Sequence, residues 1–370
     1  METNTTPADT AETHTTEQTP DNSKQFKQIC GKIGLIMTIF FASRAVALLV
    51  LGLIYKNVNF TSETVSYLAW LPINAIFLYF IPIIAASLIL RNENKTTLSA
   101  SYRRPKNLPK ALGNFPALFG LGMGVNLIMQ GAKWLIGKLS GSGGIDPDSF
   151  GTMETLVPPN IFCAVFLAFH MIIMAGVFEE ILCRKQLLGA MRPYGNGFAI
   201  IISGLLFGIM HGNLIQSTYA FVVGIALGYI AIQTGSILVP TILHCMFNSI
   251  SATMMVFMST DTIAYTLDST AAPANHEPNS AVLAAYGVFM AFFVLLMVAG
   301  LGLAIKRIGK IKAYARHTAA DKATHLLPEL TTKRKCVALL TTAPALIMLL
   351  LAVEAHLGSP LLEKLFEVLS

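Results

Sequence analysis

The chain has 370 residues, of which 54% are hydrophobic and only 12% are charged. Soluble domains average about 25% charged residues, so a water-soluble globule of this size is excluded. A disordered chain, a coiled coil and a disulfide scaffold are excluded as well. What remains is an all-α polytopic transmembrane helix bundle. The formal net charge of +6 does not require a nucleic acid partner, because basic residues accumulate in the cytoplasmic loops of membrane proteins.

Four regions follow one another along the chain. Residues 1–28 are polar and predict a disordered cytoplasmic tail, and residues 29–159 predict N-terminal transmembrane helices. Residues 160–259 predict the helical core that carries the chemistry, and residues 260–370 predict C-terminal transmembrane helices. A span needs about 20 apolar residues, which gives about eight or nine spans. The apolar stretches are 33–54, 67–90, 112–137, one from near 160 up to the charged residues at 179–185, 197–211, 216–233, 238–259, 281–305 and 336–354.

The loops between these stretches differ in charge. Loops 91–110 and 305–335 are rich in Lys and Arg, whereas loops 139–159 and 260–280 carry acidic residues and neither Lys nor Arg. With nine spans, the basic loops fall on one side of the membrane and the acidic loops on the other. Because basic loops stay inside, we expect a multi-pass protein of the cell membrane with a cytoplasmic N-terminus.

Ionisable side chains inside a span are costly, so each is a functional candidate. The first cluster is EEILCR at 179–184. Glu180 and Arg184 share a helix face and can form an ion pair, whereas Glu179 lies about 100° away and has no local cation, which suits a general base. The alternative is that these residues mark the cytoplasmic end of the fourth span. Arg44, inside the first span, also needs a partner, which the sequence does not name.

Two further clusters lie in later apolar stretches. The sequence FGIMH ends at His211 and places Phe207 on the same helix face. The sequence HCMFN places His244 and Asn248 on one face in the same way. A structural histidine bonded to a carbonyl is the alternative for the first of these. A hydrogen-bonded pair between helices is the alternative for the second.

The three clusters can reach a similar depth in the membrane. The sequence PYGNG at 193–197 is a dense turn signal. Glu179 and His211 are equally far from Gly195, so they are level in an antiparallel helix pair. The sixth and seventh apolar stretches turn near residues 234–236. His244 is only a turn or two of helix beyond them, so it too lies toward the cytoplasmic side.

A helix break follows the second cluster. His211 is succeeded at once by Gly212 and Asn213, so the break would lie inside the bilayer. Irregular backbone is tolerated there only when it is packed in protein or lines a wet cavity. We therefore expect a water-filled intramembrane chamber that opens toward the cytoplasm.

These residue types fit a hydrolytic centre. Glu179 and His211 can hold and deprotonate a water molecule, and His244 and Asn248 can donate to the oxyanion that forms when a carbonyl is attacked. The competing design is a divalent metal such as zinc, held by Glu179, His211 and His244. The chain has no HExxH motif, and Asn248 is a poor zinc ligand. A mechanism without a cofactor is therefore favoured.

In these motifs the chain resembles the CPBP family of CAAX prenyl proteases and bacteriocin-processing enzymes, also called the Abi family. The pattern of that family is EExxxR, then FxxxH, then HxxxN or HxxxD, on successive transmembrane helices. This chain has all three in that order, within about residues 160–255. The resemblance implies an intramembrane endopeptidase, for which both metal-dependent and glutamate-dependent mechanisms have been described.

The resemblance also implies a role for each residue. Glu179 would be the base that activates water with His211, and His244 and Asn248 would form the oxyanion site. The supporting residues would be Glu180, Arg184 and Phe207. The implied partners are the lipid bilayer and a membrane-associated peptide or protein substrate, with no nucleic acid.

Two other functions could use the same residues. A proton-coupled transporter would use the glutamates and histidines as a proton relay, but the repeated halves typical of transporters are not seen in this sequence. A non-catalytic membrane scaffold or immunity protein predicts that Glu179 can be changed without consequence. Mutation of Glu179 therefore separates the peptidase from the scaffold.

Overall fold

The computed structural model describes residues 22–93, 104–105, 107–140, 158–267, 277–320 and 332–356. Every regular element in these ranges is helical, which confirms the predicted all-α bundle. The helices before the candidate site are α1 (Asn22–Asn57), α2 (Glu63–Asn74), η1 (Ala75–Phe80), α3 (Ile81–Ile89), α5 (Leu108–Leu112) and α6 (Phe115–Ser140).

The remaining helices carry the candidate site and the C-terminal region. One continuous rod is built from α7 (Ile161–Phe169), η4 (His170–Ala175), α8 (Gly176–Glu180), η5 (Ile181–Leu188), α9 (Gly189–Met191) and η6 (Arg192–Tyr194). It is followed by α10 (Asn196–Ile209), α11 (Leu214–Thr234), α12 (Leu238–Met258), α13 (Asp261–Leu267), α14 (Ser280–Ala320), α15 (Thr332–Leu340) and α16 (Ala343–His356).

Seven helical segments among the described residues are long and apolar enough to cross a membrane, and they coincide with seven of the nine predicted stretches. The fifth stretch forms α10, whereas the ninth is divided between the end of α15 and α16. Helices α10 and α16 have only 14 residues each. At 1.5 Å per residue, 14 residues extend roughly 21 Å, less than the hydrocarbon core of a bilayer. Whether these two segments cross stays a prediction.

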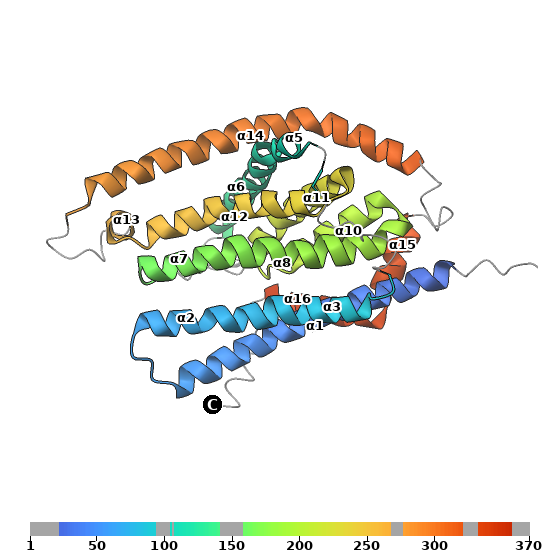
Figure 1. Ribbon diagram of the computed structural model, residues 1–370, viewed down its shortest axis with the longest axis horizontal. Helices are drawn as coiled ribbons and strands as arrows, with labels where there is room; N and C mark the ends of the chain where they lie inside the picture. The colour runs from blue at the N-terminus through green and yellow to red at the C-terminus, as the bar shows by residue number, and fades with distance from the viewer. Residues whose placement is uncertain are drawn as a thin grey trace, which may run out of the picture.

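The long helices lie side by side in the bundle (Figure 1). The rod of residues 161–194 is packed against α12, and α10 and α11 form a contacting antiparallel pair next to them. On one side of this central group lie α1 and α3, with α16 against α1. On the other side α6 contacts α11, and α14 contacts α6. The central group carries all three polar clusters.

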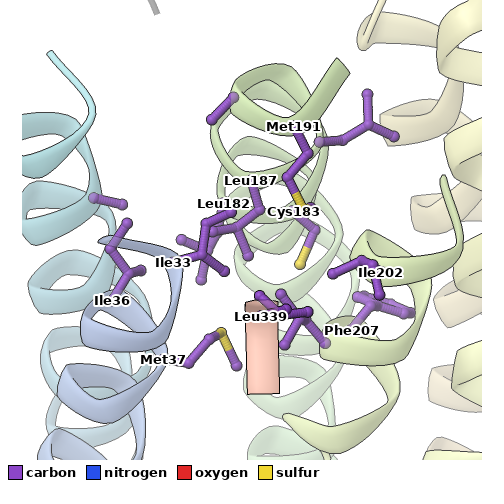
Figure 2. Packing of buried hydrophobic residues seen from close by; sticks show 14 of the residues in the cluster. Ile33, Ile36, Met37, Leu182, Cys183, Leu187, Met191, Ile202, Phe207 and Leu339 are labelled. Atoms are coloured by element: carbon purple, nitrogen blue, oxygen red, sulfur yellow. The ribbon is translucent and has the colours of Figure 1, made fainter. Parts of the chain in front are cut away.

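Two apolar cores hold the group in place. The first joins α1 to the rod and to α10, where Met37 of α1 lies near Leu182 and Phe207 (Figure 2). The second joins α6 to α11, α12 and α14 around Phe119 and Phe247. Burial of large apolar side chains on both flanks fixes the central helices relative to each other.

The predicted N-terminal tail, residues 1–28, extends too far along the chain. Helix α1 begins at Asn22, so residues 22–28 are helical, whereas residues 1–21 lie outside the described part of the chain. The reason is Phe26, which is only 1% exposed and whose ring centroid lies 4.9 Å from that of Tyr194. An aromatic contact of this kind extends the helix beyond the apolar stretch.

Helices α6 and α14 touch at their backbones. A Cβ atom added to Gly300 would overlap the carbonyl oxygen of Pro116, and one added to Gly120 would overlap the backbone nitrogen of Leu301. Small residues allow such close helix approach inside a membrane. Gly120 and Gly300 therefore mark a close contact between α6 and α14.

The Gly300→Ala substitution should force these helices apart. Overpacking of this kind typically costs about 1–3 kcal/mol, which thermal unfolding of the purified protein in detergent would detect as a lower midpoint. Gly302→Ala is the matched control, because an added Cβ at Gly302 meets no atom within 4 Å. Equal midpoints for the two variants would contradict the contact.

Candidate active site

The rod that carries the first cluster is not a regular α-helix. Two π-helical segments, η4 and η5, flank the short segment α8, which ends with Glu179 and Glu180. Such π-turns occur often at functional sites. Within α8, a Cβ on Gly176 would lie 2.6 Å from Cys245 Sγ, so α8 and α12 approach closely. This approach places Glu180 beside His244.

Glu180 is the centre of a buried charge network. Its Oε2 lies 3.1 Å from Nε of Arg184, and both side chains are 0% exposed, so the predicted pair on one helix face is confirmed. Its Oε1 lies 3.0 Å from Nδ1 of His244, a contact that the sequence did not predict. Arg184 also donates from Nη2 to the carbonyl of Gly224 at 3.3 Å. The network therefore ties the rod to α11 and α12.

Glu179 faces the other nitrogen of the same imidazole. Its Oε2 lies 3.9 Å from Nε2 of His244, and its side chain is 15% exposed. Among the described residues, this oxygen is buried without a hydrogen-bond partner. Because Glu180 takes Nδ1 of His244, the ring is turned so that Nε2 points toward Glu179. The two adjacent glutamates thus differ in their surroundings. Glu180 is held by Arg184 and His244, whereas Glu179 Oε2 has no hydrogen-bond partner among the described residues.

His211 is fixed by the backbone of its own helix. Its Nδ1 lies 2.8 Å from the carbonyl oxygen of Phe207. A carbonyl oxygen only accepts, so Nδ1 carries the proton in this contact and the neutral ring keeps a lone pair on Nε2. This bond is the one that the structural alternative for His211 predicts, and it also fixes a tautomer whose Nε2 can accept a hydrogen bond from water. The catalytic role of His211 therefore stays a prediction.

Phe207 brings the three clusters together. Its ring centroid lies 5.1 Å from that of His211 and 5.5 Å from that of His244. On the same ring, Cζ of Arg184 lies 4.5 Å from the centroid, a cation–π contact. Phe207 is fully enclosed in the first apolar core (Figure 2). The residues of EEILCR, FGIMH and HCMFN therefore converge, as the sequence predicts.

Asn248 is partly engaged by the rod. Its Nδ2 donates to the carbonyl of Met171 at 2.8 Å, within the π-helical segment η4. An amide nitrogen has two donors, so this bond uses one of them. Asn248 lies one turn from His244 on α12, and the bond to Met171 holds its amide in one orientation.

The helix break after His211 is stabilised in part by the side chain of Arg44 from α1. Asn213 accepts from the backbone nitrogen of Gln216 at 2.7 Å and so caps α11. Arg44 donates from Nη1 to the carbonyl of Met210 at 3.3 Å, at the C-terminal end of α10, where a cation is favoured. This carbonyl is the partner that the sequence could not name for Arg44.

Gly212 should be sensitive to substitution because of this arrangement. It has φ = +73°, and an added Cβ would lie 2.5 Å from Nη1 of Arg44. We expect Gly212→Ala to displace Arg44 and to lower any activity that depends on His211, in addition to a left-handed backbone cost of about 1–2 kcal/mol. Gly235→Ala is the matched control, because Gly235 has φ = +61° and no atom within 4 Å of an added Cβ.

The measurement compares thermal unfolding and peptide cleavage for the two glycine variants. The two variants should lower the midpoint of thermal unfolding by similar amounts. Only Gly212→Ala should also lower the rate of peptide cleavage. Arg44→Ala combined with Gly212→Ala removes the clash and the carbonyl contact together. Equal cleavage by the two single variants would show that Arg44 does not position His211.

The alternative ligands Glu179, His211 and His244 are not grouped as a three-ligand set. Among the described residues, no three His, Cys, Asp or Glu side chains lie together closely enough to hold a metal ion. His244 Nδ1 is taken by Glu180, and His211 Nδ1 is taken by a carbonyl. Such bonds orient the ring of a metal-ligating histidine as well as that of a catalytic one, so the choice between a metal site and a site without metal stays a prediction.

Comparison with known proteins agrees with the motifs. Residues 161–250 match the family model described as type II CAAX prenyl endopeptidase Rce1-like. No curated protein and no solved structure matches the chain. The matched segment begins at α7 and ends within α12, so it contains the rod, α10, α11 and the part of α12 that carries His244 and Asn248. The matched family is one of peptidases of the intramembrane CAAX type, and its model covers the three clusters. The predicted family resemblance is therefore confirmed: residues 161–250 of this multi-pass helical chain are Rce1-like.

Proposed function

We propose that the chain is an intramembrane endopeptidase that cleaves membrane-associated proteins or peptides with a glutamate-activated water. One observation carries the proposal: Glu179 Oε2 is buried without a hydrogen-bond partner in the described part of the chain and lies 3.9 Å from His244 Nε2. A carboxylate held beside imidazoles in a partly enclosed site is suited to general-base catalysis. The Rce1-like segment supports the reaction class.

In the proposed first step, Glu179 and the lone pair of His211 Nε2 hold one water molecule. Glu179 takes a proton from this water while the water oxygen attacks the carbonyl carbon of the scissile peptide bond. The carbonyl oxygen becomes an oxyanion, which needs donors aimed at the position where the charge develops. The remaining N–H of Asn248 and a protonated Nε2 of His244 would supply them.

In the proposed second step, Glu179 returns its proton to the amide nitrogen. The carbon–nitrogen bond breaks, and the products are a new carboxyl terminus and a new amine. Glu180 and Arg184 do not exchange protons with the substrate in this scheme. Their ion pair at 3.1 Å holds the rod, and the bond from Glu180 to His244 orients the imidazole.

In the proposed scheme, the charges of the site compensate one another. Arg184 compensates Glu180 in the buried ion pair, and a His244 that donates from both ring nitrogens would compensate Glu179. Such compensation is favoured because an unpaired charge in low dielectric is costly.

The test uses the purified full-length chain in liposomes. The probes are a farnesylated peptide ending in a CAAX sequence, the same peptide without the lipid, and an unlipidated membrane-spanning peptide. Mass spectrometry should find at least one pair of fragments whose masses sum to the peptide plus one water, also in the presence of a metal chelator. Intact probes with a folded protein, or cleavage that persists in Glu179→Gln, would refute the proposal.

A further inference from the structure

A cavity lies away from the candidate active site. It has a volume of about 610 Å³ and lies between α5, α6, α11 and α14, which meet in the upper half of Figure 1. None of its lining residues belongs to the three clusters. Of the helices around the cavity, α11 touches the clusters through the carbonyl of Gly224, which accepts from Arg184, whereas the cavity is lined by the C-terminal half of α11.

The lining of this groove changes character along the bundle. At one end the side chains are polar or basic, namely Asn107, Lys110, Asn114, Gln233, Thr234 and Arg307. At the other end they are apolar, with Leu118, Leu121, Ala226 and Ala304. Along α11 the two ends are separated by the step from Thr234 to Ala226, roughly 12 Å at 1.5 Å per residue. The groove is therefore amphipathic along its length.

The polar end carries two positive charges and no compensating acid. Among the described residues that line the groove, Lys110 and Arg307 are the charged ones. Arg307 is held in place, because its Nη1 donates to Asn114 Oδ1 at 2.5 Å and its Nη2 to the carbonyl of Gly113 at 3.5 Å. These bonds use part of its five donors. A fixed guanidinium next to an ammonium group is suited to binding phosphate.

We propose that this groove binds an anionic membrane phospholipid. The phosphate would lie between Lys110 and Arg307, and an acyl chain would follow Leu118, Leu121 and Ala226 into the bundle. Because no carboxylate among the described lining residues is available to pair with a choline group, anionic headgroups are preferred to zwitterionic ones. Lys110 and Arg307 belong to the two stretches of the sequence that are rich in Lys and Arg, and basic pockets between transmembrane helices bind anionic headgroups.

The experiment measures lipid retention by the purified full-length protein with native mass spectrometry. The probes are phosphatidylglycerol and phosphatidylcholine with identical oleoyl chains. Lys110→Gln should lower phosphatidylglycerol retention roughly fivefold, as expected for the loss of one basic contact, and leave phosphatidylcholine unchanged. The matched control is Lys306→Gln, an exposed lysine on α14 that does not line the groove.

A second variant tests the apolar end independently of charge. Ala226→Leu fills the groove and should reduce retention of both lipids, whereas Ala284→Leu on the exposed face of α14 should not. Equal effects of Lys110→Gln and Lys306→Gln, or full retention by Ala226→Leu, would overturn the proposal. So would displacement of phosphatidylglycerol by a lipidated peptide that depends on Lys110, since the groove would then bind substrate.

Discussion

Glu179→Gln should abolish peptide-bond cleavage while leaving the fold intact. The substitution keeps the size of the side chain and removes the group that accepts a proton from water, and general-base catalysis contributes about 10²–10⁴-fold in rate. Its Oε2 has no hydrogen-bond partner among the described residues, so the substitution breaks no hydrogen bond of that oxygen. Thermal unfolding should therefore remain close to that of the unchanged protein, and the fragments found by mass spectrometry should disappear.

The matched control for this prediction is Glu277→Gln. Glu277 is exposed and lies before α14, so the same chemical change there should leave the cleavage rate unaltered. Substantial turnover by Glu179→Gln would assign the base to another residue, and His211 would be the first to test. A loss of both fold and activity would instead give Glu179 a structural role.

Arg184→Met should produce the largest loss of stability among the site variants. Arg184 and Glu180 are both 0% exposed, and their ion pair is buried. Removing one partner leaves a buried carboxylate with His244 alone, and breaking a buried pair in this way typically costs about 3–5 kcal/mol. The free energy of unfolding, measured by denaturant titration in detergent micelles, should fall by an amount of this size.

Two further variants separate charge from packing at this position. Arg184→Met with Glu180→Gln removes both charges and should recover much of the lost stability, while cleavage stays low because the imidazole of His244 loses its charged anchor. Lys185→Gln, at the next residue of the rod, removes a positive charge that takes no part in the network and should change little. A single variant Arg184→Met as stable as Lys185→Gln would contradict the buried network.

Much of the fold follows from the sequence. Apolar stretches long enough to cross a membrane predict the long helices, and the turn residues at 193–197 and 234–236 lie where helices end, with positive φ at Gly195 and Gly235. Phe26 is the exception at the N-terminus, because its burial depends on Tyr194, far away in the chain. A local pattern cannot show a contact of that range.

In the candidate active site, the sequence predicts contacts within one helix but not contacts between helices. Contacts between residues four apart, such as Glu180 with Arg184, follow from the period of a helix. The link from Glu180 to His244 depends on the rotation and packing of two helices, and π-helical segments change that rotation without a local sequence signal. Arg44 binds a backbone carbonyl, and carbonyls are present at every residue, so no residue type identifies the partner.

The most direct test of the account is a comparison of peptide termini in membranes from cells that carry the unchanged protein or Glu179→Gln at equal abundance. A terminus found only with the unchanged protein would establish proteolysis that depends on Glu179 and would identify the substrate. Identical termini under all growth conditions tested would contradict the peptidase and favour a non-catalytic role for the buried network.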